Sequence, residues 1–211
     1  MSLQKLAEPV MMKFLEGLGR PAKVAIIDPG TNCAIRYSEF CFDAGVLKWV
    51  HHSQFFFAGT CSGDNYVERM MMLTKILNES EMFKYADIYL VEHQFENNVV
   101  ISLGIIVGII MSMRNKEVSE RIKRTGVRAI DSIPFLILTL EPSMKTAMIK
   151  NYAKISKNDM KTPGIEAAIK ICSEIGDVET LNLLESGGKI DDIADTVCYE
   201  YAFYNWLYSI K

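Results

Sequence analysis

The sequence predicts an α/β fold built on one mixed five-stranded β-sheet that is flanked by helices. Two short and largely apolar runs, Val24–Ile27 and Asp87–Val91, have the composition of buried strands. The first run begins a series of three extended segments, continued by Cys33–Phe42 and Val46–Phe57, whose Gly-containing turns are typical of an antiparallel meander. A further strand is expected from Gly126–Ile130 and Pro134–Leu140. Helical patterns fill most of the remaining chain, among them Val67–Phe83 and the segment from Asn97 or Asn98 to about Met113.

The N-terminal segment is predicted to be a helix outside the main domain. Apolar residues recur every four positions from Leu6 to Leu18, which predicts an amphipathic helix over Leu3–Leu18. We therefore expect residues 1–22 to form a helical extension and residues 23–211 to form one domain, in keeping with the 211-residue length. The extension could pack on the domain, contact a ligand or reach a partner.

The composition excludes several classes of protein. The formal charge of −3 excludes a uniformly basic nucleic-acid binder, so that any such binding would use a local patch. The five cysteines have no paired spacing, which favours free thiols in a reducing, intracellular compartment. The first twenty residues carry acids and lack the apolar core of a signal peptide. The uncharged run Val99–Met113 is shorter than the ~20 residues that span a bilayer, so we expect a buried helix and no membrane partner.

Two acidic residues stand where predicted strands end. Asp28 follows Val24–Ile27 and precedes Pro29-Gly30, a pair that forces a tight turn, and Glu92 follows Asp87–Val91. A carboxylate at the rim of a sheet is held by a rigid strand and stays open to water, which suits a metal ligand. The alternative for Asp28 is that it only initiates a β-turn, as Asp before Pro-Gly often does.

A second pair of acids opens the last predicted helix, which runs from about Asp191 to Tyr208. Asp192 and Asp195 are three residues apart and therefore share one face of the first turn. Acids in a first turn are also favoured by the helix dipole, which is the alternative explanation for each of them. Asp191 could support a metal site or simply cap the helix.

The four acids, taken together, predict a divalent-metal site. Four carboxylates that converge would repel each other unless cations lay between them. Mg²⁺ and Mn²⁺ prefer oxygen ligands, and two such ions about 3.5–4 Å apart suit phosphodiester hydrolysis. One ion would activate the attacking water, and the other would stabilise the leaving 3′ oxygen.

The order of these motifs resembles that of the RuvC-like Holliday-junction resolvases, which belong to the RNase H-like superfamily. IIDPGT at 26–31, VEHQF at 91–95 and DDIADTV at 191–197 are similar to the three acidic motifs of that family. PSMKTAMIK at 142–150 is similar to the segment that carries the family's active-site lysine. The resemblance covers roughly Lys23 to Tyr208. The sequence DDIAD at 191–195 is most similar to the viral branch of the family, typified by poxvirus resolvases.

The resemblance implies an RNase H-like fold and a homodimeric, Mg²⁺-dependent endonuclease that resolves four-way junctions in branched DNA by paired symmetric nicks. Two ions per active site, which Mn²⁺ could replace, would be held by Asp28, Glu92, Asp192 and Asp195. Lys145 would lie near the scissile phosphate or the attacking water, and Phe95 would stack on an exposed base near the crossover. In a poxvirus-like virus such an enzyme would act in the cytoplasm.

The basic segment Lys145–Lys161 is the expected DNA contact. It contains five lysines and one acid, and we predict that Lys150, Lys154 and Lys157 bind DNA in a salt-dependent manner. The alternative is a solvated helix face. Elsewhere, Gly104 and Gly108 lie four apart in the helix that begins near residue 97, which predicts a smooth face for a close neighbour. That neighbour could be another helix of the fold or a second subunit.

Three other functions remain open to the sequence. The chain could be another RNase H-like nuclease that acts on RNA–DNA hybrids or on branched DNA generally, or it could bind junctions without cutting them. Asp-Pro-Gly-Thr also occurs in phosphate-binding turns of sugar kinases and actin-like ATPases, but those folds need two such domains and more Gly-rich loops. The N-terminal helix and the stretch His51–Asp64 are longer than a minimal resolvase needs, which leaves the range of branched substrates open.

Overall fold

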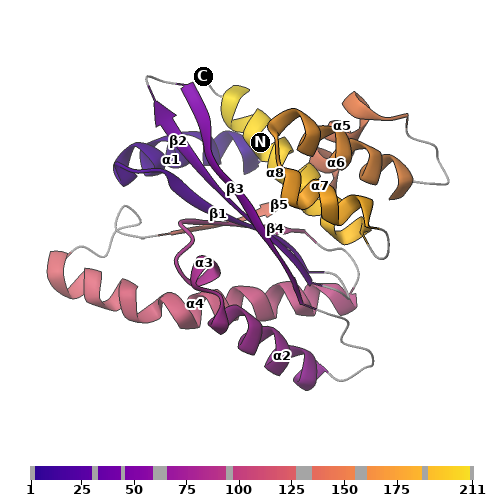
Figure 1. The fold of residues 1–211 in the computed structure, drawn as a ribbon. Helices are drawn as coiled ribbons and strands as arrows, with labels where there is room; N and C mark the ends of the chain where they lie inside the picture. Colours follow the sequence, from indigo (N-terminus) through magenta and orange to yellow (C-terminus); the bar gives the residue numbers. More distant parts are fainter. Residues whose placement is uncertain are drawn as a thin grey trace.

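The protein folds around one mixed β-sheet with helices on both faces (Figure 1). A computed structural model describes residues 3–29, 33–43, 46–58, 66–93, 97–126, 135–154, 161–186 and 190–209. The strands are β1 (Ala22–Asp28), β2 (Cys33–Asp43), β3 (Val46–Ala58), β4 (Ile88–Glu92) and β5 (Leu136–Leu140), and their order in the sheet is β3-β2-β1-β4-β5. The first three strands pair antiparallel, as the predicted meander requires, whereas β4 pairs parallel with both β1 and β5. The predicted mixed sheet flanked by helices is therefore confirmed.

The helices divide between the two faces of the sheet. They are α1 (Leu3–Leu18), α2 (Tyr66–Glu79), α3 (Glu81–Lys84), α4 (Asn97–Thr125), α5 (Pro142–Tyr152), α6 (Lys161–Ile175), α7 (Val178–Glu185) and α8 (Asp191–Ser209). Figure 1 shows α2, α3 and α4 below the sheet, and α1 together with α5 to α8 above it.

The side chains of the central strands alternate between the two faces of the sheet, and each set packs under its own layer of helices. Ala25 and Ile27 of β1 pack in the core between the sheet and helices α2 and α4. Val24 and Ile26 pack in the core between the sheet and α8. Successive side chains of a strand point to opposite faces, so a strand covered on both faces must be apolar throughout. The continuous run at 24–27 therefore marks a strand that is buried on both sides.

Helix α8 is buried along two sides. Tyr199, Phe203 and Leu207, spaced four apart, pack on the sheet, and Val197 and Cys198 belong to a third cluster that joins α8 to α5 and α6. Because residues four apart share one face of a helix, the side chain one turn before Tyr199 also faces the sheet. That side chain belongs to Asp195.

Two helices differ from their predicted extents. The helical pattern over Val67–Phe83 is divided at Ser80, whose hydroxyl accepts a hydrogen bond from the backbone N–H of Phe83 and caps the short α3. Helix α4 continues through the charged residues to Thr125, and Arg114 on its buried side donates to the carbonyl oxygens of Lys84 and Ala86. Most of the extended segment predicted at Gly126–Ile130 falls within residues 127–134, which lie outside the described ranges.

The N-terminal helix packs on the body of the protein. Met11 and Leu15 of α1 are buried in the same core as Phe203 and Leu207 of α8. The division into an extension and a domain stays a prediction. None of the four cysteines within the described ranges forms a disulfide, and no helix in those ranges is both long and apolar enough to cross a membrane.

Candidate active site

The carboxylates of Asp28 and Glu92 lie side by side at the ends of parallel strands. Ile26 of β1 pairs with Leu90 of β4, so the last residues of the two strands, two positions further on, also lie level with each other. Both strands point these residues toward the face covered by α8, since Ile26 and Leu90 belong to the core on that face. The two carboxyl groups share a side-chain hydrogen bond.

Helix α8 brings Asp195 to the same place. Its charge acts on Asp28, so the three acids from β1, β4 and α8 converge although they are far apart in the sequence. Asp192 lies one turn earlier on α8, where its charge acts on Asp195 and Lys161. Asp191 pairs with the exposed ammonium of Lys161. The ligand roles of all four predicted acids stay predictions.

Lys145 enters the site from the first turns of α5. This helix begins directly after β5, whose last residue Leu140 pairs with Glu92, so the helix starts beside the acidic strand end. The Lys145 Nζ lies 2.6 Å from Oδ2 of Asp195 and 3.4 Å from Oε1 of Glu92. The lysine that the sequence motif singled out therefore contacts two of the predicted acids.

Burial and mutual repulsion weaken the acidity of the carboxyl groups. Asp28 is only 5% exposed, and its pKa is raised well above the usual range by desolvation first and then by the neighbouring Glu92 and Asp195. Desolvation also raises the pKa of Asp195, with Glu92 and Asp192 adding to the effect and Lys145 opposing it. Without more positive charge nearby, the site favours holding a proton.

The groups that face these acids are held in their proton-donating forms. Burial lowers the pKa of the Lys145 ammonium, but the carboxylates of Asp195 and Glu92 outweigh it and raise this pKa overall. The Tyr199 hydroxyl donates to Oε1 of Glu92 at 2.5 Å, and burial followed by the charge of Glu92 raises its pKa. Lys145 Nζ also lies 5.0 Å from the centre of the Tyr199 ring.

A buried ion cluster fixes α8 against the sheet. Arg36 of β2 is fully buried, and its guanidinium pairs with Glu200 of α8 and, at 2.7 Å, with Asp177, the N-cap of α7. A third donor of Arg36 reaches the hydroxyl of Thr180 at 2.8 Å. Burial raises the pKa of Asp177, but Arg36 and the Thr180 N–H outweigh it and bring this pKa below the usual range. The cluster sets the position of the helix that carries Asp195.

Sequence reasoning missed both Tyr199 and Arg36. Tyr199 follows Asp195 by four residues, so a helical repeat places it on the same face as a predicted ligand. Arg36 lies between Ile35 and Tyr37 in a predicted strand, and a charged residue that such a strand buries requires a partner. These two signals, spacing and a charge within a strand, could have identified them.

The chemistry of the acidic cluster fits a hard divalent cation. Asp28, Glu92 and Asp195 offer only oxygen donors, and among the described side chains three carboxylates meet one ammonium. In the part of the chain that the structure describes, no three acidic, histidine or cysteine side chains stand in an arrangement that holds a metal ion. Lys145 and Tyr199 instead occupy the acceptor atoms of Glu92 and Asp195.

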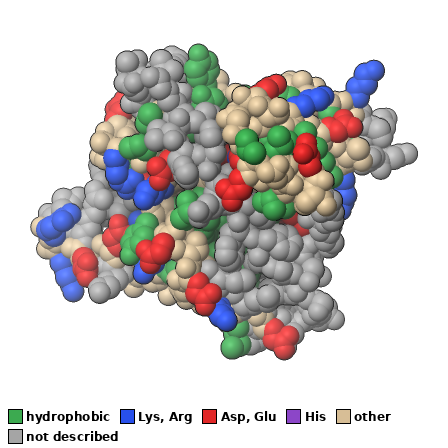
Figure 2. Space-filling view, in the orientation of Figure 1, with side chains coloured by type: hydrophobic (Ala, Val, Ile, Leu, Met, Phe, Trp, Pro, Cys, Tyr) green, Lys and Arg blue, Asp and Glu red, His purple; other side chains and the backbone are tan. Residues whose placement is uncertain are grey.

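The predicted DNA-binding residues are described only in part. Lys150 lies on α5 and Lys154 follows it, and both side chains are exposed. Figure 2 shows Lys and Arg side chains projecting at the upper right, where α5 and α6 lie, and at the far left, over the C-terminal end of α4. Phe95 and Lys157 lie outside the described residues.

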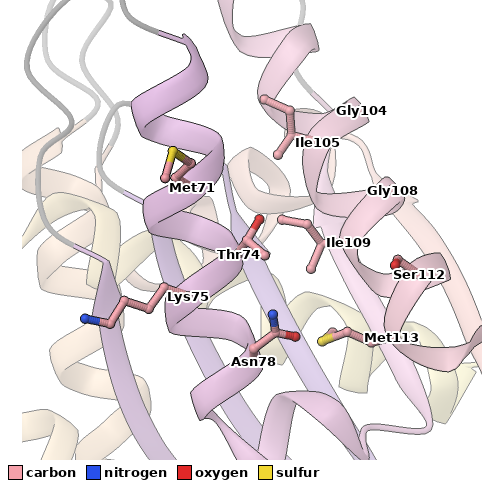
Figure 3. A pocket seen from close by; sticks show the side chains of 10 residues that line it. All are labelled: Met71, Thr74, Lys75, Asn78, Gly104, Ile105, Gly108, Ile109, Ser112 and Met113. Atoms are coloured by element: carbon pink, nitrogen blue, oxygen red, sulfur yellow. The ribbon is translucent and has the colours of Figure 1, made fainter.

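The smooth face of α4 borders an open groove. Gly104 and Gly108 line a space of about 880 Å³ between α4 and α2, together with Met71, Thr74, Asn78 and Met113 among others (Figure 3). A Cβ atom added to either glycine would meet nothing within 4 Å among the described residues. The expectation that a helix of the same fold packs closely on this face is therefore wrong for the described chain. The second possibility, another subunit, stays a prediction.

Comparisons with solved structures find resolvases. The crystal structure of the yeast mitochondrial Holliday junction resolvase Ydc2 matches with a TM-score of 0.50 and 13% sequence identity. The match covers 96% of this chain and 88% of that chain. The Thermus thermophilus RuvC structure is 16% identical over 89% of this chain and 95% of that chain, with a TM-score of 0.49. T. thermophilus RuvC in complex with Holliday junction substrate is 17% identical over 87% of this chain and 94% of that chain, with a TM-score of 0.46. No protein-family model and no curated protein matches the chain. At this identity the match to the yeast protein shows a shared fold.

Proposed function

We propose that this chain is a metal-dependent, structure-selective endonuclease that resolves four-way DNA junctions by paired symmetric nicks. One observation carries the proposal: Asp28, Glu92 and Asp195 meet at the ends of two parallel strands, with Lys145 between two of them. The fold shared with a yeast Holliday junction resolvase supports it. The DDIAD motif favours the viral, poxvirus-like branch of these enzymes.

The site residues would act together on one scissile phosphate. Asp28, Glu92, Asp192 and Asp195 would hold two Mg²⁺ ions, or Mn²⁺ in their place. When bound, these ions would supply Lewis acidity for the attacking water and for the leaving 3′ oxygen. The Lys145 ammonium would then be released from the carboxylates and pair with the phosphate, which is an anionic oxygen acceptor as the carboxylates are. Binding of the cations would lower the raised pKa values of Asp28 and Asp195, and both carboxyl groups would then be ionised.

The substrate would meet the protein through basic and aromatic side chains around this site. Lys150 and Lys154 are exposed on the same side of the sheet as Lys145, where they would contact backbone phosphates. We propose the same role for Lys157 and a stacking role for Phe95. These contacts would make binding steeply dependent on salt.

Paired nicks require two active sites, and we propose a homodimer. The groove between α2 and α4 offers an exposed, largely apolar surface on the face of the sheet opposite α8. Gly104 and Gly108 leave this surface without side chains that would keep a partner helix away. A second copy that packs there would bring two acidic clusters into one particle, one for each nick.

A nicking assay tests this function. Purified protein is incubated with Mg²⁺ and a four-way junction that carries a label on each strand in turn, with a linear duplex and an RNA–DNA hybrid of the same sequence as controls. Two nicks at symmetry-related positions, absent in EDTA, are expected. Tight binding without nicks would favour a non-catalytic junction binder, and preferential cutting of the hybrid would favour another RNase H-like nuclease.

A further inference from the structure

Tyr199 contacts two of the groups in the acidic cluster. Its hydroxyl donates to Oε1 of Glu92 at 2.5 Å, and its ring lies 5.0 Å from Lys145 Nζ. It follows Asp195 by one helical turn on the face of α8 that packs on the sheet. Only 1% of its surface is exposed, so the contact with Glu92 is shielded from water.

The hydrogen bond fixes one oxygen of Glu92. Both Tyr199 and Lys145 donate to Oε1, and Glu92 also shares a hydrogen bond with Asp28. A carboxylate at a strand end can otherwise rotate about its last side-chain torsion, which is broad for Glu. A donor on one oxygen restricts that rotation and decides which lone pairs of Glu92 remain open to a ligand.

The ring of Tyr199 supports the lysine. An ammonium within about 6 Å of a ring centre is attracted to the face of the ring. Lys145 therefore has Tyr199 beneath it in addition to its contacts with Asp195 and Glu92. One residue of α8 thus constrains both the carboxylate and the ammonium of the site.

We infer that Tyr199 is a positioning residue, whose hydroxyl orients Glu92 for divalent-cation binding and whose ring holds Lys145 beside it. This inference rests on the proposed metal-dependent function. Outer residues that orient a metal ligand are typically worth about 10–100-fold in metal affinity. Tyr199 would therefore act on the affinity for the cation and on the nicking rate, and not on the affinity for junction DNA.

Tyr199→Phe tests the hydroxyl, because it removes one oxygen atom and keeps the ring under Lys145. The binding of Mn²⁺ to the protein alone is measured by electron paramagnetic resonance, and nicking and junction binding are measured in parallel. We expect Mn²⁺ affinity to fall about 10–100-fold, the Mg²⁺ concentration for half-maximal nicking to rise, and junction affinity to stay unchanged. Melting curves set a temperature at which every variant is folded.

Tyr37→Phe is the matched control. Tyr37 is also a buried tyrosine, but its hydroxyl pairs with Ser80 on the opposite face of the sheet, 3.0 Å away. Tyr37→Phe removes the hydroxyl of a buried tyrosine without touching the acidic cluster. Mn²⁺ affinity in this variant should equal that of the unmodified protein.

The Glu92→Gln background separates a positioning role from a general loss of packing. If Tyr199 acts through Glu92, the Tyr199→Phe effect on Mn²⁺ binding should largely disappear when Glu92 is already replaced. Equal effects in both backgrounds, or wild-type Mn²⁺ affinity in Tyr199→Phe, would overturn the inference and leave the proposed function standing. An unmodified protein that neither binds Mn²⁺ nor nicks the junction would overturn both.

Discussion

The ammonium of Lys145 lies 2.6 Å from Oδ2 of Asp195, although the two residues are 50 positions apart in the sequence. The contact joins α5 to α8 directly above the ends of β1 and β4. It partly balances a cluster of buried carboxylates that holds more negative than positive charge.

Replacing either strand-end acid should abolish cleavage and spare DNA binding. Asp28→Asn and Glu92→Gln each remove one proposed metal ligand while leaving the exposed lysines of α5 unchanged. We expect the nicking rate in Mg²⁺ to fall at least about 10³-fold, in line with losses at essential catalytic groups, and junction affinity to change less than about twofold. Nicking at the normal rate by either variant would show that the site is assigned to the wrong residues.

The stability of the metal-free protein should fall as pH rises. The pKa values of Asp28 and Asp195 are higher in the folded protein than in the unfolded chain, so the folded state binds their protons more tightly. Their stabilising contribution is complete below the ordinary aspartate pKa of about 4 and is lost as pH rises from there toward the raised values. Melting temperatures in EDTA should therefore decrease between pH 5 and pH 8.

Two comparisons link that pH dependence to the site. Asp28→Asn should flatten the decrease and raise the melting temperature at pH 8 in EDTA by a few degrees. Mg²⁺ should raise the melting temperature of the unmodified protein more at pH 8 than at pH 5, because cations bind the ionised carboxylates. The exposed Glu79→Gln, on α2, is the control and should leave the pH dependence unchanged. A stability that increases from pH 5 to pH 8 in EDTA would contradict the assigned shifts.

Arg36 should be one of the most sensitive positions in the protein. Arg36→Met leaves Glu200 and Asp177 buried without their cation, and breaking such a pair costs about 3–5 kcal/mol. The free energy of unfolding in urea measures the loss. Arg124→Met, on the exposed end of α4, is the control and should change this free energy by less than about 0.5 kcal/mol. A loss of about 1 kcal/mol or less at Arg36 would mean that the cluster does not hold α8 in place.

Filling the α4 face should break the proposed dimer. Gly104→Leu combined with Gly108→Leu places two side chains in the open groove, while the exchange of helical glycines favours α4 itself by about 1 kcal/mol each. Sedimentation should therefore show a folded monomer where the unmodified protein is a dimer. Asn115→Leu adds an apolar side chain at an exposed position of α4 outside the groove, and it should keep the dimer. If the double variant stays as dimeric as the control, the subunits meet elsewhere.

The strand and the helix that carry the acids could be predicted from the sequence, because each element depends on the pattern of residues close to one another in the chain. Val24–Ile27 is apolar on both alternating faces, so it had to be a doubly covered strand that delivers Asp28 to a sheet edge. The spacing of Asp192 and Asp195 likewise follows from helical geometry alone.

Contacts between distant segments could not be predicted in this way. The Tyr199–Glu92 hydrogen bond spans 107 positions and the Arg36–Glu200 pair spans 164, and both depend on how α8 lies across the sheet. The sequence left two possible neighbours for the face at Gly104, another helix of the fold or a second subunit, because the spacing of small residues does not say what packs on them. Helix α4 extends beyond its apolar run, and Arg114 in this extension donates to the carbonyl oxygen of Ala86, 28 positions away.

Anomalous diffraction from a crystal soaked in Mn²⁺ tests the central claim most directly. We predict manganese peaks about 2 Å from carboxylate oxygens of Asp28, Glu92 and Asp195, with the Lys145 ammonium displaced from its present contacts. A crystal in which Mn²⁺ binds elsewhere, while Glu92 and Asp195 keep their contacts with Lys145 and Tyr199, would contradict the account.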